Sequence, residues 1–377
     1  MPTSSPIPAR TYQRLLRLVA VALVCASALA VGRDARAADV REITQFSTPR
    51  LPESVEVDAA GNAYVWVPSI RQVIKVSPDG TQQTLPPIPI PNGTTAGLAL
   101  GGAGDVYVAV NSPTPGASGV WRIASRGGSV VQYASIPIGG ALNALAFDRL
   151  GRLYVSDSAK GVVWRVAENG PFEPWLEHVL LAGQKPAQTP FGSTGAAGIE
   201  FDIFGSLYIA NSDFGRIARV RVDGDGTPGT LEVWAEDPAL VGADGIAFDG
   251  AGNLFVAVSS QDRLIRITPG RSIQAIASAA DGLDFPSDVA IPAAGEGAGF
   301  AYVTNFAALS ASGAVLRPSR PALLALQIAH DRHPYHPGYP ARFRDAPGLL
   351  SALQRAIDRA FFGLSPSSRP SPADLLR

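Results

Sequence analysis

The chain has 377 residues, of which 46% are hydrophobic and 17% charged, and its formal net charge is −1 at pH 7. The basic residues are scattered along the sequence rather than clustered, which argues against nucleic acid or an anionic membrane surface as a partner. The 39 glycines and 32 prolines favour many short strands and turns over helices.

The N-terminal segment has the features of a secretory signal peptide. Three arginines precede an apolar run over residues 18–31, and an A-x-A cleavage pattern ends at Ala37. We therefore expect residues 1–37 to be removed and the mature chain to be periplasmic or secreted, without a membrane span. The single cysteine, Cys25, lies in this segment, so the mature chain forms no disulfide. A lipid anchor on Cys25 is the alternative, and it is disfavoured because Val24 is not a small residue.

A repeated motif begins directly after this segment. It reads Val-x-Val-Asp-x-x-Gly-x-x-Tyr-Val from Val55 to Val65 and recurs five times at intervals of 43 to 54 residues. The later copies begin at Leu98, Leu145, Ile199, Ile246 and Val289. This spacing suits four-stranded blades and predicts an all-β, six-bladed β-propeller.

The turn inside the motif has the sequence D-x-x-G. An Asp at its first position can bond the turn backbone, and a Gly at its fourth tolerates positive φ. We therefore predict structural roles for the aspartates of these turns, which are Asp58, Asp148, Asp202 and Asp249.

The propeller is expected to span residues 38–328. The sixth unit lacks a fourth strand, and residues 40–46 can supply it, which would close the ring and remove an exposed edge. Residues 329–377 form a short Pro/Arg/His-rich appendage with one short amphipathic helix expected at 348–362. Three histidines of this appendage have a spacing that suits a metal, although a solvated tail is favoured; they are His330, His333 and His336.

Residues with strong oxygen ligands stand two positions before the first residue of the motif in three units. Glu53, Asn143 and Asp244 occupy this position in the first, third and fifth units. Rotational repetition would gather them at one mouth of the central channel, and their oxygens suit a divalent cation, with calcium most favoured. The alternative is that each side chain satisfies loop backbone or lines a water-filled channel.

A second ring of polar residues is expected at the end of the second strand in three units. It contains Asp157, Asn211 and Asn305, and Asp288 is expected close by. We consider Asn211, Asp288 and Asn305 as residues that contact a substrate or line the channel mouth, and Asp157 as a candidate general base.

At these positions the chain resembles the senescence-marker-protein/gluconolactonase family over residues 45–328, and it shares blade rhythm with NHL and YVTN-type propellers. The segment from Asp244 to Asp249 matches the family's D-G-[IM] motif, and Glu53 matches its first-blade Glu. The resemblance implies a six-bladed propeller that hydrolyses lactones or related esters with one divalent metal held by these residues. Where the family has an Asn ligand in blade four, this chain has Ala197. That substitution implies an altered site, an abandoned one, or replacement by Asn211.

Two functions remain open at this point. As an enzyme, the chain would hydrolyse a lactone on a cation held by Glu53, Asn143 and Asp244, with Asp244 or Asp157 as base. As a binding module, it would hold a sugar-like ligand, a peptide or a protein through irregular loops such as residues 178–195. In either case we expect a small-molecule partner before any other, and a monomer.

Overall fold

The computed structural model describes residues 39–91, 93, 97–125, 128–136, 139–184, 194–292 and 297–328. The chain divides into two compact units, residues 1–329 and 330–377. The described residues all belong to the first unit, and the appendage with His330, His333 and His336 lies outside them.

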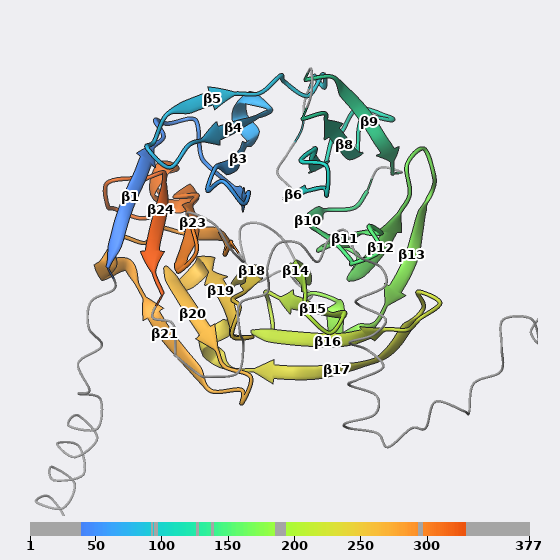
Figure 1. Ribbon diagram of the computed structural model, residues 1–377. Coiled ribbons are helices and arrows are strands. Elements are labelled where there is room, and N and C mark those ends of the chain that lie inside the picture. Colours follow the sequence, from blue (N-terminus) through green and yellow to red (C-terminus); the bar gives the residue numbers. More distant parts are fainter. Residues whose placement is uncertain are drawn as a thin grey trace, which may run out of the picture. The chain divides into compact units, whose positions relative to one another are not determined.

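Six four-stranded antiparallel sheets surround a common centre, as Figure 1 shows. The prediction of an all-β, six-bladed propeller is confirmed. Blade one contains β2 (Ser54–Val57), β3 (Ala63–Val67), β4 (Gln72–Val76) and β5 (Gln82–Thr84). Blade two contains β6 (Leu98–Leu100), β7 (Val106–Val110), β8 (Gly119–Ile123) and β9 (Val130–Ser135). Blade three contains β10 (Leu142–Phe147), β11 (Leu153–Asp157), β12 (Val162–Val166) and β13 (Phe172–Glu177).

The second half of the ring has the same plan. Blade four contains β14 (Ala196–Phe201), β15 (Ser206–Asn211), β16 (Arg216–Val222) and β17 (Pro228–Glu236). Blade five contains β18 (Ala243–Phe248), β19 (Leu254–Val258), β20 (Arg263–Ile267) and β21 (Ile273–Ala277). Blade six contains β22 (Pro286–Ala290), β23 (Phe300–Asn305), β24 (Ala322–Gln327) and β1 (Val40–Gln45). The described helices are short: η1 (Pro68–Ile70), η2 (Val179–Leu181), η3 (Pro238–Leu240), η4 (Ser259–Gln261), η5 (Ala279–Asp281) and α2 (Ala308–Ala311).

The ring closes by pairing the two ends of the propeller chain. Strand β1 pairs antiparallel with β24 over Val40–Gln45, as the sequence predicted, and Figure 1 shows it at the outer edge of blade six. Phe46 continues the contact with a backbone bond from its N–H to Pro321 O at 2.8 Å. This pairing leaves no unpaired strand edge at β24.

The D-x-x-G turns are built as predicted. Asp58 Oδ1 accepts the backbone N–H of Ala60 at 3.0 Å and of Asn62 at 2.9 Å. Gly61 has φ of 80°, which a residue with a side chain rarely adopts. The same pair of bonds is made by Asp148, Asp202 and Asp249. These aspartates therefore shape the turns between inner and second strands.

Neighbouring blades pack through a repeated aromatic contact. Tyr154 on β11 meets Trp175 of its own blade at 4.9 Å and Phe201 of the next blade at 5.2 Å, both edge-to-face. Tyr107 and Tyr208 make the equivalent pairs in blades two and four. Aromatic rings bury large apolar areas, so these contacts hold consecutive sheets together without a disulfide.

Among the described residues, no helix is both long and apolar enough to cross a membrane.

Candidate functional site

Glycines on the inner strands let neighbouring blades approach closely near the axis. A Cβ on Gly245 would overlap the Asp288 side chain of the next blade, and one on Gly198 would overlap Asp244 O. The D-G segment of blade five therefore combines two requirements. Its glycine makes room for blade six, while Asp244 carries the polar group.

The structure brings together the three residues assigned to one mouth. Asn143 hydrogen-bonds the Asp244 carboxylate, and the charges of Glu53 and Asp244 repel each other. Blades one, three and five are not neighbours in the ring, so side chains from them can meet only at its centre. We call Glu53, Asn143 and Asp244 the axial site. All three are half-buried.

Glu53 is held in an environment that opposes its charge. Burial raises its pKa well above the usual value, and the carboxylates of Asp244 and Asp288 raise it further. Its Oε2 atom is buried and has no hydrogen-bond partner. An orphaned buried carboxylate oxygen beside two other carboxylates calls for either a proton or a cation.

The pKa of Asp244 is set by burial, by the Asp288 charge and by two neutral neighbours. Burial raises its pKa to about 7, with the Asp288 charge adding to the effect. Hydrogen bonds from Ser259 and Asn143 act in the opposite direction by stabilising the charged form. Its carboxyl group therefore changes protonation near neutral pH.

Asp288 lies beside the axial site and ties blade six to blade one. Its Oδ2 accepts Ser54 Oγ–H at 2.6 Å and Val55 N–H at 3.0 Å, and its Oδ1 accepts Val289 N–H at 2.8 Å. Burial raises its pKa to about 6 despite these bonds. Oδ2 of Asp288 thus accepts both bonds that join blade six to blade one, whereas Oδ1 bonds the backbone of its own strand.

The ring at the ends of the second strands has a different environment. Asp157 is fully buried; its Oδ1 accepts Ala141 N–H at 2.9 Å and Lys160 N–H at 3.1 Å, and its Oδ2 faces Trp164 Nε1 at 3.3 Å. Through these bonds Asp157 holds the backbone on both sides of β10 and β11, at Ala141 and Lys160. The assignment of Asp157 as a general base therefore has no geometric support.

Asn211 and Asn305 have the same role in blades four and six. Asn211 Nδ2 donates to Leu180 O at 3.0 Å and Ala182 O at 2.9 Å. Asn305 Nδ2 donates to Gly282 O at 2.8 Å, and its Oδ1 accepts Asp284 N–H at 3.1 Å. Both side chains fasten the connection that enters the same blade, so Asn211 does not replace the amide that blade four lacks at Ala197.

Sequence reasoning missed two further axial carboxyl groups, Glu56 and Glu200. Burial raises the pKa of Glu200 to about 8, and burial together with the Glu200 charge raises that of Glu56 well above its usual value. The signal was present in the repeat: Glu stands at the second motif position in blades one and four. The other blades have Ala there, as Ala99, Ala146, Ala247 and Ala290.

The axial site supplies only part of the ligand set that a cation needs. Within the described ranges, no group of three or more His, Cys, Asp or Glu side chains is arranged to hold a metal ion. The axial site offers two carboxylates and one amide, and the orphaned Oε2 of Glu53 fits a hard cation. Further ligands would have to be water or backbone oxygens.

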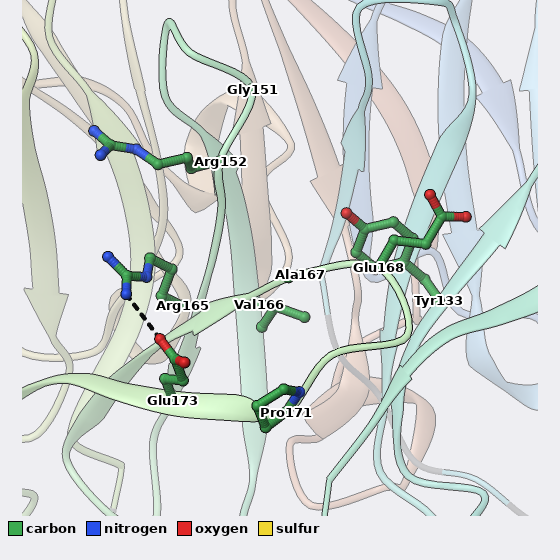
Figure 2. Close-up of a pocket in the computed structure, with 9 residues that line it drawn as sticks. All are labelled: Tyr133, Gly151, Arg152, Arg165, Val166, Ala167, Glu168, Pro171 and Glu173. Carbon is green, nitrogen blue, oxygen red and sulfur yellow. Dashed lines mark hydrogen bonds and ion pairs between the residues drawn. The ribbon is translucent and has the colours of Figure 1, made fainter. Parts of the chain in front are cut away.

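A separate cavity of about 420 Å³ lies at the outer part of blade three and does not include the axial site. Figure 2 shows the Arg165–Glu173 ion pair on its wall, which measures 2.7 Å. Arg152 pairs with Asp148 and Glu168 with Arg122, so the charged side chains of this cavity are already matched within the protein. The lining residues are Tyr133, Gly151, Arg152, Arg165, Val166, Ala167, Glu168, Pro171 and Glu173.

No family model and no curated protein matches the sequence. Among solved structures, a calcium-binding regucalcin from Agrobacterium tumefaciens is similar with a TM-score of 0.57 and 17% identity, over 77% of this chain and 94% of that one. A putative gluconolactonase has a TM-score of 0.54 and 14% identity, over 78% and 92%. The chain shares its six-bladed propeller with these proteins.

The predicted likeness to gluconolactonase-like propellers is therefore confirmed for the fold, and the structural neighbours also include a luciferin-regenerating enzyme. A virginiamycin B lyase from Staphylococcus aureus is similar as well, with a TM-score of 0.51 and 15% identity over 71% of this chain and 82% of that one. At these identities the likeness concerns the fold, and one fold supports several chemistries.

Proposed function

We propose that this propeller is an exported, metal-dependent hydrolase that opens lactones or related esters at the axial site. The observation that carries the proposal is the buried, unpartnered Oε2 of Glu53 beside the Asp244 carboxyl group. Two carboxylates that repel each other in a half-buried site gain stability from a divalent cation. The lactonase-like neighbours support a small-molecule substrate.

Glu53, Asn143 and Asp244 would hold the cation, and calcium suits their oxygen atoms best. When bound, the cation would polarise the carbonyl group of the substrate. Asn143 fixes the orientation of the Asp244 carboxyl group through the hydrogen bond between them. The Asp244 carboxyl group is thus already oriented before any substrate enters.

Asp244 is the base in this proposal. Asp244 is assigned this role because its carboxyl group lies at the axial site, where it would accept a proton from the attacking water. The water oxygen forms a bond to the carbonyl carbon, the ring C–O bond breaks, and the proton held by Asp244 passes to the leaving alkoxide. Asp157 has no part in this scheme, because its oxygens anchor loops.

The test uses the mature chain from residue 38, stripped of metal and then supplied with Ca²⁺. We expect Ca²⁺ to bind in calorimetry and to restore hydrolysis of a lactone panel, and Glu53→Gln and Asp244→Asn to lose both. Asp79→Asn in an exposed turn is the matched control. If the wild type binds no divalent ion and hydrolyses no lactone, the proposal is wrong.

A second candidate, a propeller that binds a ligand without chemistry, is favoured by one observation. Ala197 presents a methyl group where the resemblance leads us to expect an amide ligand. In that case the intact chain would bind a sugar-like or peptide ligand without turnover. Shortening the loop 178–195 between Gln184 and Thr194, outside the part that Asn211 fastens, would abolish binding while leaving the fold intact. Residues 185–193 of this loop lie outside the described part of the chain.

A further inference from the structure

Ser259 lies between the axial site and the junction of blades five and six. It begins η4 directly after β19 and is 6% exposed. Its Oγ lies 3.0 Å from Asp244 Oδ2 and 2.8 Å from Pro286 O of the next blade. A serine hydroxyl has one proton and can donate it to only one of these acceptors at a time.

The contact with Pro286 is a repeated feature of the fold. In blade three, Ser158 occupies the same position, and its Oγ donates to Ala196 O of blade four at 2.8 Å. In blade two, Asn111 Nδ2 donates to the equivalent carbonyl, Leu142 O, at 2.8 Å. The bond between blades is therefore common to several junctions, whereas the bond to a carboxylate of the axial site is an addition at Ser259.

An ionised carboxylate is a stronger acceptor than a backbone carbonyl. When Asp244 is charged, the hydroxyl proton of Ser259 therefore points to Asp244 Oδ2. Asn143 bonds the same carboxylate from another blade. Two donors from different blades remove the rotational freedom that an aspartate on a strand would otherwise keep.

We propose that Ser259 is a positioning residue that holds the Asp244 carboxylate in the orientation needed at the axial site. This inference rests on the proposed function for its role in cation binding. The geometric part, the orientation of Asp244, does not depend on a cation. Partners that fix a metal-binding side chain typically contribute 10- to 100-fold to metal affinity.

The test compares Ser259→Ala with Ser158→Ala, which removes the same bond between blades but lies away from Asp244. Calorimetry with Ca²⁺ alone should show about 10- to 100-fold weaker binding for Ser259→Ala and unchanged binding for Ser158→Ala. Ser259→Thr keeps the hydroxyl and should restore most of the affinity. Crystal structures of both alanine variants should show the Asp244 carboxylate turned from Asn143 only in Ser259→Ala.

Equal Ca²⁺ affinity in the two alanine variants, or an unmoved Asp244 in Ser259→Ala, overturns the inference while leaving the proposed function intact. A wild type that binds no Ca²⁺ contradicts the proposed function instead. The crystal structures then decide the inference alone, since a rotated Asp244 supports positioning by Ser259 and an unmoved one refutes it. Should Ser259→Ala fail to fold, Ser259→Val against Ser259→Thr makes the same comparison at equal side-chain volume.

Discussion

The carboxyl groups of Glu56 and Glu200 repel each other across the axis of the propeller. They come from β2 in blade one and β14 in blade four, which are opposite in a ring of six. No salt bridge to either is found among the described residues. Their pKa values are raised mainly by burial.

Glu200→Gln should make the protein more resistant to alkaline pH. The folded-state pKa of Glu200 is raised to about 8, so the folded state holds this proton more tightly than the unfolded state does. Stability is then highest at low pH and falls as pH rises from the unfolded value of about 4.3 towards 8. Thermal midpoints at pH 5 and pH 9 should differ less in the variant than in the wild type. Glu42→Gln, on an exposed residue of β1, is the control and should behave like the wild type. If the thermal midpoint of Glu200→Gln falls between pH 5 and pH 9 as much as that of the wild type, Glu200 is not the source of the pH dependence.

Asp157→Asn should weaken the fold without slowing hydrolysis. An amide in place of this carboxylate turns its NH₂ group towards either Trp164 Nε1–H or the backbone N–H groups of Ala141 and Lys160, so a donor faces a donor. We expect a loss of about 1–3 kcal/mol in the free energy of unfolding, measured in urea. Hydrolysis that disappears at unchanged stability would restore Asp157 as a base.

Asp288→Ala should destabilise the junction between the first and last blades more than Ser54→Ala does. The aspartate variant removes both bonds from blade one and leaves Val55 N–H unpaired, whereas the serine variant removes only the hydroxyl bonds. The expected cost for Asp288→Ala is about 1–3 kcal/mol in urea denaturation. Equal losses in the two variants would show that the bond to Val55 N–H contributes nothing.

Arg317→Lys should loosen the loop between β23 and β24. The guanidinium forks onto Asp262 with two bonds of 2.8 Å and also pairs with the buried Asp284 at 2.5 Å. An ammonium group cannot reproduce this fork. We expect a lower thermal midpoint and faster cleavage of residues 306–321 in limited proteolysis. Arg271→Lys, in a turn of blade five, serves as the control. Identical cleavage of both variants would show that the bonds of Arg317 to Asp262 and Asp284 do not hold this loop.

Much of the architecture was readable from the sequence because its determinants are local. The D-x-x-G turns depend on a side chain and a glycine three residues apart, and the structure has the predicted bonds at Asp58 and φ at Gly61. The closing strand at residues 40–46 followed from counting strands in the sixth unit. Neither step needs knowledge of distant contacts.

The two rings of polar residues could not be separated in this way. Asp157 and Asp244 are both acidic residues at strand ends, yet one anchors loops and the other lies at the axis. Which role applies depends on the connections that pass over each strand end. Their paths are set by loops of irregular length, for which the repeat gives no rule.

The sequence by itself determined the blade, its turns, the number of blades and how the ring closes, because these follow from periodicity and turn chemistry within one repeat. Only the tertiary structure decided that the Glu200 charge acts on Glu56 and that Ser259 reaches Asp244. The first interaction depends on the rotation accumulated over three blades. The second depends on the register between β18 and η4 at the end of β19, and no single repeat encodes either.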